Sequence, residues 1–171
     1  ARLHTQFPGS GQSGDPTYDS FRMGQQASID GGVRMDTINR DALAALLDRI
    51  GPAIILTHSR AGPFGWLAAD ARPGLVKGIV AIEPNGPPFK HPEGAMAANR
   101  PPAAAERPWG VTYERMTFDP PVTDPAELAP VQQPSQGPDL QGCWVASGPP
   151  RTLPNLVGVP ILIVSSEAGF H

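Results

Sequence analysis

Two short apolar runs with a helix-like segment between them constrain the fold of this chain most strongly. Residues 53–57 (AIILT) and 76–84 (VKGIVAIEP) have the length and composition of strands, and a third run follows at 159–164 (VPILIV). Runs that are apolar almost throughout are typical of parallel strands buried on both faces. Residues 62–71 (GPFGWLAADA) predict a short helix. The order strand, helix, strand predicts a βαβ unit, so we expect the α/β class with a mostly parallel sheet.

A second helix is predicted upstream, over residues 37–50. Its apolar residues recur at the helical spacing and form the stripe expected to face the core: Leu43, Leu46, Leu47 and Ile50. Asn39 or Thr37 is expected to cap its start, and Gly51-Pro52 to stop it. Residues 1–36 are polar and glycine-rich, which predicts a loop with little regular structure.

The stretch between the second and third apolar runs has a different composition. Seventeen of the 22 prolines fall in residues 84–160, and proline disfavours helix interiors and central strands. The stretch also carries large side chains that could anchor it: Phe89, Trp109, Tyr113, Met116, Phe118 and Trp144. We therefore interpret 84–158 as an ordered, irregular excursion over the sheet, a cap or lid, within one domain spanning 1–171. The alternative is a flexible linker.

Composition excludes several classes of function. The net charge of −3 and the scattered 13 Lys and Arg give no basic surface for nucleic acid or lipid headgroups, and no apolar run is long enough to span a membrane. Cys143 is the only cysteine, and the four histidines show no metal-ligand spacing, so no metal site is expected. The glycines of "GSGQSG" have the spacing of a dinucleotide loop, but no strand leads into them and Asp15-Pro16 follows. No cofactor is expected.

The ends of the sequence are unusual for a whole domain. The chain starts at Ala1 with no initiator Met or signal-peptide pattern, and it stops at His171, directly after an apolar run. We expect further sequence on both sides, with a processed chain as the alternative.

Polar residues follow the first two predicted strands at the edge where an α/β sheet binds its ligands. Ser59 lies two residues past the first strand, and Glu83 ends the second. If the strands are neighbours, both side chains point into one crevice at the carboxyl ends of the strands.

The strand–Ser–helix layout is that of a nucleophile elbow, a tight turn that needs small residues two positions before and after the serine. Those positions hold Thr57 and Ala61 here; Ala61 suits the turn, and the β-branched Thr57 suits it less. The helix that follows directs its positive end at Ser59, and the backbone N–H of Arg60 is where an oxyanion donor is expected. The alternative is that Ser59 only caps the helix.

These blocks closely resemble a group of bacterial esterases in the α/β-hydrolase superfamily. The resemblance is carried by "LTHSRAGPFGW", "LVKGIVAIEPNGPPF", "HTQFPGSGQSGDPTYDSF", "RPWGVTYERMTFDPPVTDPAEL" and "VPILIVSSEAGFH". It implies a partial α/β-hydrolase fold and a serine hydrolase with a Ser-His-acid triad. Ser59 carries over as the nucleophile and Glu83 as the acid. Glu167 is a rival acid, because it follows the third strand, where most α/β-hydrolases place theirs.

The general base of such a triad is a histidine. His58 precedes the nucleophile and projects differently, while His4 and His91 lie in loops. His171 is just past the third strand, whereas the resemblance implies a histidine one strand later. We expect the base to lie beyond His171, and the isolated 171-residue chain to be a poor enzyme for that reason.

Arg60 departs from the resemblance, because similar sequences have an uncharged polar residue there. Its side chain could favour anionic substrates, or it could point to solvent or pair with an acid.

The sequence thus predicts a serine hydrolase, a carboxylesterase acting through an acyl-enzyme on a small-molecule ester. The alternatives are a non-catalytic α/β-hydrolase-like binding protein and, on the glycine pattern alone, a nucleotide-binding oxidoreductase. Substrate identity, compartment and oligomeric state are not encoded in recognisable signals.

Overall fold

A computed structural model describes the chain at residues 8–25, 31–90, 107–135, 137 and 142–166. It divides into two compact units, Ala1–Asp30 and Gly31–His171. Each unit is described by itself.

The first unit contains a helix in a region for which the sequence predicted a loop. Helix α1 (Pro16–Met23) begins after Asp15, whose carboxylate accepts hydrogen bonds from the backbone N–H groups of Thr17 and Tyr18. A capping Asp followed by Pro in the first helical position is a strong start signal. The loop prediction was wrong because it rested on the polar, glycine-rich composition of residues 1–36 and did not weigh the start signal at Asp15-Pro16.

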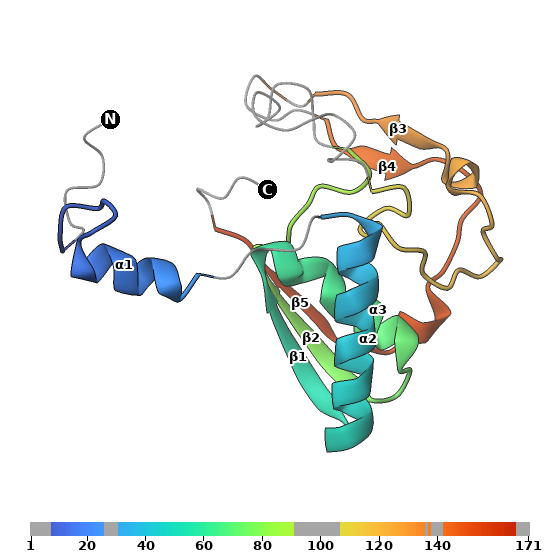
Figure 1. Ribbon diagram of the computed structural model, residues 1–171. Helices are drawn as coiled ribbons and strands as arrows, with labels where there is room; N and C mark the ends of the chain where they lie inside the picture. The colour runs from blue at the N-terminus through green and yellow to red at the C-terminus, as the bar shows by residue number, and fades with distance from the viewer. Residues whose placement is uncertain (1–7, 26–30, 91–106, 136, 138–141, 167–171) are drawn as a thin grey trace. The chain divides into compact units, whose positions relative to one another are not determined.

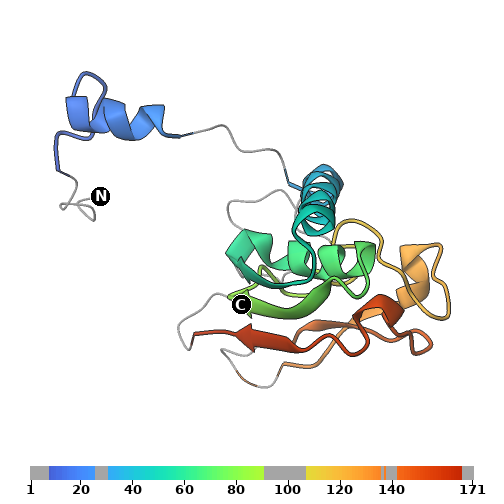
Figure 2. The ribbon, with the colours of Figure 1, turned by 90° about the horizontal axis from the view of Figure 1, so that it is seen from below.

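The second unit is built on a parallel sheet of three strands, in the order β1-β2-β5. The strands are β1 (Ala53–His58), β2 (Val76–Ile82) and β5 (Ile161–Val164). Helices α2 (Val33–Ile50) and α3 (Gly62–Ala71) lie together on one face of the sheet (Figures 1 and 2). The predicted α/β class with a parallel sheet is confirmed.

The opposite face of the sheet is exposed within the described part of the chain. Side chains alternate along β1, so that Thr57 is buried toward the helices while Ile54 and Leu56 are 68% and 64% exposed. All four residues of β5 are exposed as well. The prediction that these strands are buried on both faces was wrong for β1, because the described helices cover one face only. It was also wrong for β5, the strand at the end of the sheet order, whose residues are exposed on both faces.

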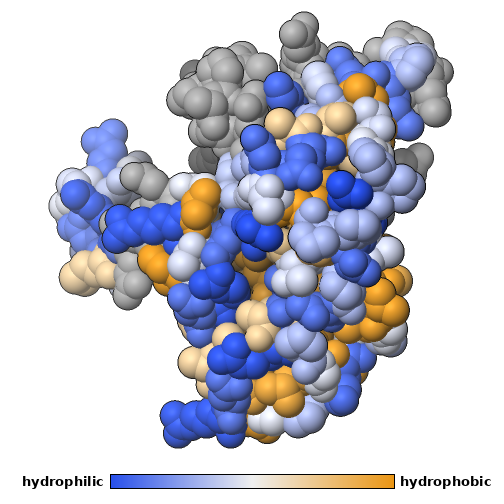
Figure 3. All heavy atoms as spheres, turned by 90° about the vertical axis from the view of Figure 1, so that its right-hand side faces the viewer, coloured by the Kyte–Doolittle hydropathy of each residue, from blue (hydrophilic) through white to orange (hydrophobic). Residues whose placement is uncertain are grey.

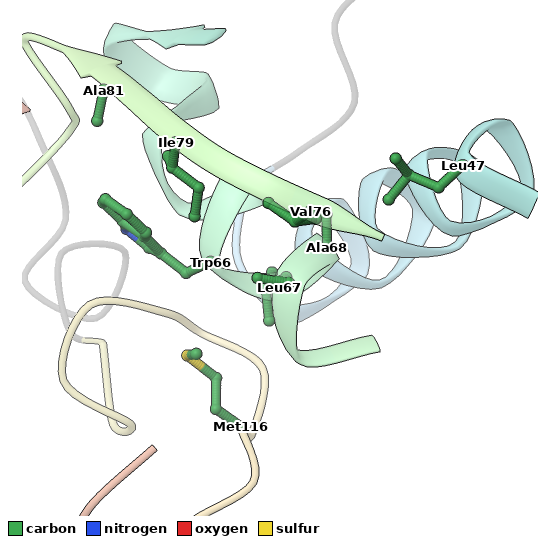
Figure 4. Packing of buried hydrophobic residues seen from close by; sticks show 9 residues of the cluster. Leu47, Trp66, Leu67, Ala68, Val76, Ile79, Ala81 and Met116 are labelled. Carbon is green, nitrogen blue, oxygen red and sulfur yellow. The ribbon is translucent and has the colours of Figure 1, made fainter. Parts of the chain in front are cut away.

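The main core lies between the sheet, α3 and the side of α2 that packs on α3. Helix α3 contributes Trp66, Leu67 and Ala68, and β2 contributes Ile79 and other apolar residues (Figure 4). Met116, from the proline-rich region, is 1% exposed and reaches the same cluster. This packing fixes α3 against the two strands that it connects.

Helix α2 begins four residues before its predicted start. Its N-cap is Gly32, and the side chains of Thr37 and Asn39, predicted as caps, instead bond carbonyls one turn back. The predicted stripe is only half buried. Leu47 is 2% exposed, while Leu46 and Ile50 are 47% and 59% exposed, because Ala44 and Leu47 form the buried face.

The described parts of 84–158 are ordered but contain little regular structure. A short antiparallel pair, β3 (Pro130–Gln132) and β4 (Trp144–Ala146), is accompanied by two 3-10 turns, η4 (Pro125–Leu128) and η5 (Pro154–Leu156). A second hydrophobic cluster holds this region together: Phe89, Val122 and Leu128, with Trp109, Phe118 and Trp144 packed against it. Its role as a cap stays a prediction.

Hydrophobic residues (orange) also reach the surface in several patches between hydrophilic ones on the face shown in Figure 3. None of the helices in the described ranges has the length and apolar composition needed to cross a bilayer.

Candidate functional site

Ser59 lies at the sharp turn between β1 and α3. The strand ends at His58, a single 3-10 turn η1 (Ser59–Ala61) follows, and α3 begins at once with Gly62. Ser59 has φ +52°, in the left-handed region that residues other than glycine seldom adopt. Such a conformation costs on the order of 1–3 kcal/mol and persists only where the surrounding structure imposes it. Here the strand before Ser59 and the helix after it both pack into the core.

Glu83 occupies the matching position at the end of β2. It too is left-handed, with φ +46°. The register pairs His58 with Ile82, so Ser59 and Glu83 are the next residues of two neighbouring parallel strands, whose backbones lie about 4.8 Å apart. The backbone N–H of Asn85 donates to the Ser59 carbonyl at 2.8 Å. The structure therefore brings the two turns together at one edge of the sheet.

The end of β5 completes this edge. The Glu83 N–H donates to the Val164 carbonyl at 2.7 Å, and the Ser166 N–H donates to Glu83 Oε1 at 2.6 Å. A carboxylate that accepts a backbone N–H is held in a defined orientation. Glu83 is thus hydrogen-bonded to the end of β5, while Asn85, two residues later, bonds the Ser59 turn.

Two glycines at the start of α3 allow the turn to pack closely. A Cβ on Gly62 would lie 2.7 Å from Pro84 Cβ and 2.8 Å from Pro84 Cα. A Cβ on Gly65 would lie 3.1 Å from Ile79 Cγ2 and 3.4 Å from the methyl group of Thr57. Thr57 is therefore accommodated because the helix residue facing it is glycine. The Thr57 hydroxyl is buried and has no hydrogen-bond partner among the described residues.

We predict that Gly62→Ala destabilises the protein by about 1–3 kcal/mol, as overpacking of a well-filled site does. The added methyl group would press on the backbone that follows Glu83. Gly78→Ala in β2 is the matched control, because its Cβ meets nothing closer than 3.5 Å. Chemical denaturation measures both; equal free energies of unfolding for the two variants would contradict the close packing at Gly62.

The Arg60 side chain lies at a pocket of about 140 Å³ on the helix side of the turn. Besides Arg60, the pocket is lined by residues from the start of α2, the start of α3 and two loops: Gly31, Gly32, Met35, Asp36, Pro63, Asn85 and Tyr113. A Cβ on Gly31 would lie 3.2 Å from Arg60 Nη2, so the guanidinium lies against the start of α2. Within the described residues, no carboxylate lies within ion-pair distance of Arg60.

Asp36 anchors the proline-rich region beside this pocket. It is 2% exposed, and its Oδ2 accepts from the backbone N–H groups of Tyr113 and Glu114 at 2.7 and 3.1 Å. Burial raises the pKa of the Asp36 carboxyl, against the opposing effect of these two hydrogen bonds and of the Arg107 guanidinium. Arg40 also forms an ion pair with Glu114. The segment that carries Tyr113 is therefore fixed to α2.

The remaining candidates are placed as follows. His58 is exposed on the face of β1 opposite to Thr57. The other three histidines and the rival acid lie outside the described residues: His4, His91, His171 and Glu167. No cluster of three or more His, Cys, Asp or Glu side chains occurs in the parts of the chain that the structure describes.

Sequence reasoning missed the contacts that hold the site. Asn85 and Ser166 act through backbone N–H groups, which leave no signal in residue type. The close approach of α3 could have been inferred from Gly62 and Gly65, because glycines three apart on one helix face allow close packing.

A curated fungal protein is similar to the whole chain. The protein, described as "Probable secreted lipase phiG" from a fungal species (strain ATCC 74256), is 46% identical over 175 residues, which cover 100% of this chain. The chain spans 45% of that protein's length. No protein-family model and no solved structure matches the chain. Identity at this level over the full chain establishes that the chain is homologous to a fungal protein described as a probable secreted lipase.

Proposed function

We propose that this chain carries the nucleophile and the acid of a serine hydrolase of the α/β-hydrolase superfamily that cleaves carboxylic esters. The observation that carries the proposal is the left-handed turn at Ser59, directly between a parallel strand and a helix. This is the geometry of a nucleophile elbow, which exposes a serine hydroxyl at the carboxyl edge of the sheet. Homology to a probable lipase supports ester chemistry.

In the proposed mechanism, Ser59 Oγ attacks the ester carbonyl while a histidine accepts its proton. The developing oxyanion is bound by the Arg60 backbone N–H, close to the positive end of α3. The histidine then protonates the leaving alcohol, and an acyl-enzyme remains on Ser59. Water, activated by the same histidine, attacks the acyl group and releases the acid.

Glu83 is proposed to orient the histidine and to stabilise its protonated form. Its Oε1 accepts a hydrogen bond from the Ser166 N–H, which restricts the orientation of the carboxylate. The exposed His58 is not proposed as the base, because it lies on the face of β1 opposite to Thr57, away from α3. We propose that the base lies outside the described residues.

The name of the fungal relative supports a finer statement about the substrate. A lipase acts on lipid esters, so we propose that the whole protein accepts esters with an apolar acyl or alcohol part. The proline-rich region, with Trp109, Phe118 and Trp144 close together, is proposed to shape the site that receives it. The description of the relative as secreted supports a place of action outside the cell.

A fluorophosphonate probe tests the nucleophile directly, because it reacts covalently only with an activated serine. We expect the full-length protein to be labelled, Ser59→Ala to lose the label and Ser20→Ala to keep it. Ser20 is an exposed serine on α1 and serves as the matched control. Absence of labelling in folded wild-type protein would overturn the proposal and favour a non-catalytic binding protein.

A further inference from the structure

We propose that the pocket beside Arg60 is a subsite for an anionic group of the substrate, so that the enzyme favours esters that carry a carboxylate at one end in addition to the apolar acyl or alcohol part proposed above. The inference deepens the proposed function and rests on it. It names Arg60 as a specificity-determining residue through its side chain, in addition to its backbone N–H.

Three residues that line the pocket are close neighbours of the candidate nucleophile. Arg60 follows Ser59 in the chain, Pro63 is the second residue of α3, and the Asn85 N–H donates to the Ser59 carbonyl. One end of an ester bound at Ser59 is proposed to lie in this pocket, next to Arg60. The volume of about 140 Å³ holds several water molecules, or a carboxylate on a short carbon chain, but not a long acyl chain.

The charges around the pocket favour an anion. The Arg60 guanidinium lies against Gly31 and, among the described residues, has no carboxylate partner. A planar guanidinium binds carboxylates through two parallel hydrogen bonds. The first turn of α2 also lines the pocket, and its N-cap Gly32 offers no side-chain acceptor to the helix N–H groups.

Asp36 is the only carboxylate among the described residues that line the pocket, and its oxygen bonds the backbone of a neighbouring segment. It is 2% exposed, it accepts two backbone hydrogen bonds from the 113–114 segment, and the Arg107 guanidinium offsets its charge. The charge that faces the opening is therefore that of Arg60, which is exposed.

The test compares two esters of similar size in the full-length protein. The p-nitrophenyl monoester of succinate carries a terminal carboxylate where p-nitrophenyl 4-methylpentanoate carries an isopropyl group. We expect the ratio of kcat/KM for the charged ester over the neutral one to fall about tenfold in Arg60→Gln, within the range of one charge-assisted hydrogen bond. The ratio for Arg60→Lys should lie between those for wild type and Arg60→Gln. A salt concentration of about 0.5 M should lower the ratio for the wild-type protein.

Arg49→Gln is the matched control, because it removes the same charge from an exposed position at the other end of α2. That end lies about 24 Å from the pocket by helix length, so the ratio should not change. A ratio that is the same in wild type and Arg60→Gln would overturn the subsite.

A binding measurement separates this inference from the proposed function. If no ester is turned over, the proposed function fails. Calorimetry with monoethyl succinate then tests, independently of activity, whether the pocket binds an anion. Binding to Ser59→Ala protein that is lost in Ser59→Ala/Arg60→Gln supports the subsite. Absence of binding to Ser59→Ala protein would overturn it.

Discussion

Ser59→Ala is expected to lower kcat for ester hydrolysis by about 10⁴–10⁶-fold, the loss seen when the nucleophile of a catalytic triad is removed. The variant removes one oxygen atom from a half-buried side chain for which no hydrogen bond is recorded among the described residues. Alanine at φ +52° is as strained as serine, so the free energy of unfolding should change by no more than about 0.5 kcal/mol. Initial rates on p-nitrophenyl butyrate and a denaturant titration, both with the full-length protein, measure the two quantities.

The size of the loss distinguishes the roles considered for Ser59. A serine that only caps α3 would give a loss of stability of about 1 kcal/mol with little loss of activity. The structure gives little support to a cap, because no side-chain cap hydrogen bond is made at the start of η1 or α3. Retention of more than a tenth of the wild-type rate by the Ser59→Ala variant would contradict the nucleophile role.

The parts of the fold that local sequence determines were predictable. The predicted helix over residues 62–71 coincides with α3, because Gly-Pro starts it and Arg72-Pro73 stops it. Strands β1 and β2 differ from their predicted bounds by one or two residues. The exposed face of β1 was not predictable, since a run such as Ala53–His58 reads the same whether one or both faces are covered. Burial of a strand face depends on what packs there, which is a long-range property.

In the candidate site, too, the positions of the residues were predictable from local sequence, whereas the contacts that hold them were not. The placement of Ser59 and Glu83 at neighbouring strand ends follows from the βαβ pattern, because parallel strands share a carboxyl edge. The supporting contacts join residues far apart in the chain, as in the bond between Ser166 and Glu83. The fit of Thr57 depends on Gly65, eight residues later. A rule that requires glycine two positions before the serine misses this compensation.

Glu83→Gln is expected to lower kcat by about 10⁴-fold, the effect of replacing the acid of a triad by its amide. The amide keeps the shape of the side chain but cannot stabilise a protonated histidine, and it can hold the wrong tautomer. Its oxygen can still accept from the Ser166 N–H, so the turn should remain folded. Glu167→Gln is the comparison, because it tests the rival acid directly. Loss of activity in Glu167→Gln alone would show that Glu83 is not the acid.

Ser166 provides a test of how Glu83 is held. Ser166→Ala keeps the backbone N–H that donates to Glu83 Oε1, whereas Ser166→Pro removes it. If this hydrogen bond orients the acid, Ser166→Pro should lower kcat by about tenfold or more, while Ser166→Ala stays close to wild type, since one charge-assisted hydrogen bond is worth about 1.5–3 kcal/mol. In the Glu83→Gln background the proline substitution should have much less effect, because the charge that the N–H orients is already gone. Equal effects of Ser166→Pro in both backgrounds would mean that it acts through the loop and not through Glu83. The double-variant comparison therefore distinguishes an effect of the Ser166 N–H on the orientation of Glu83 from an effect of proline on the structure of the loop.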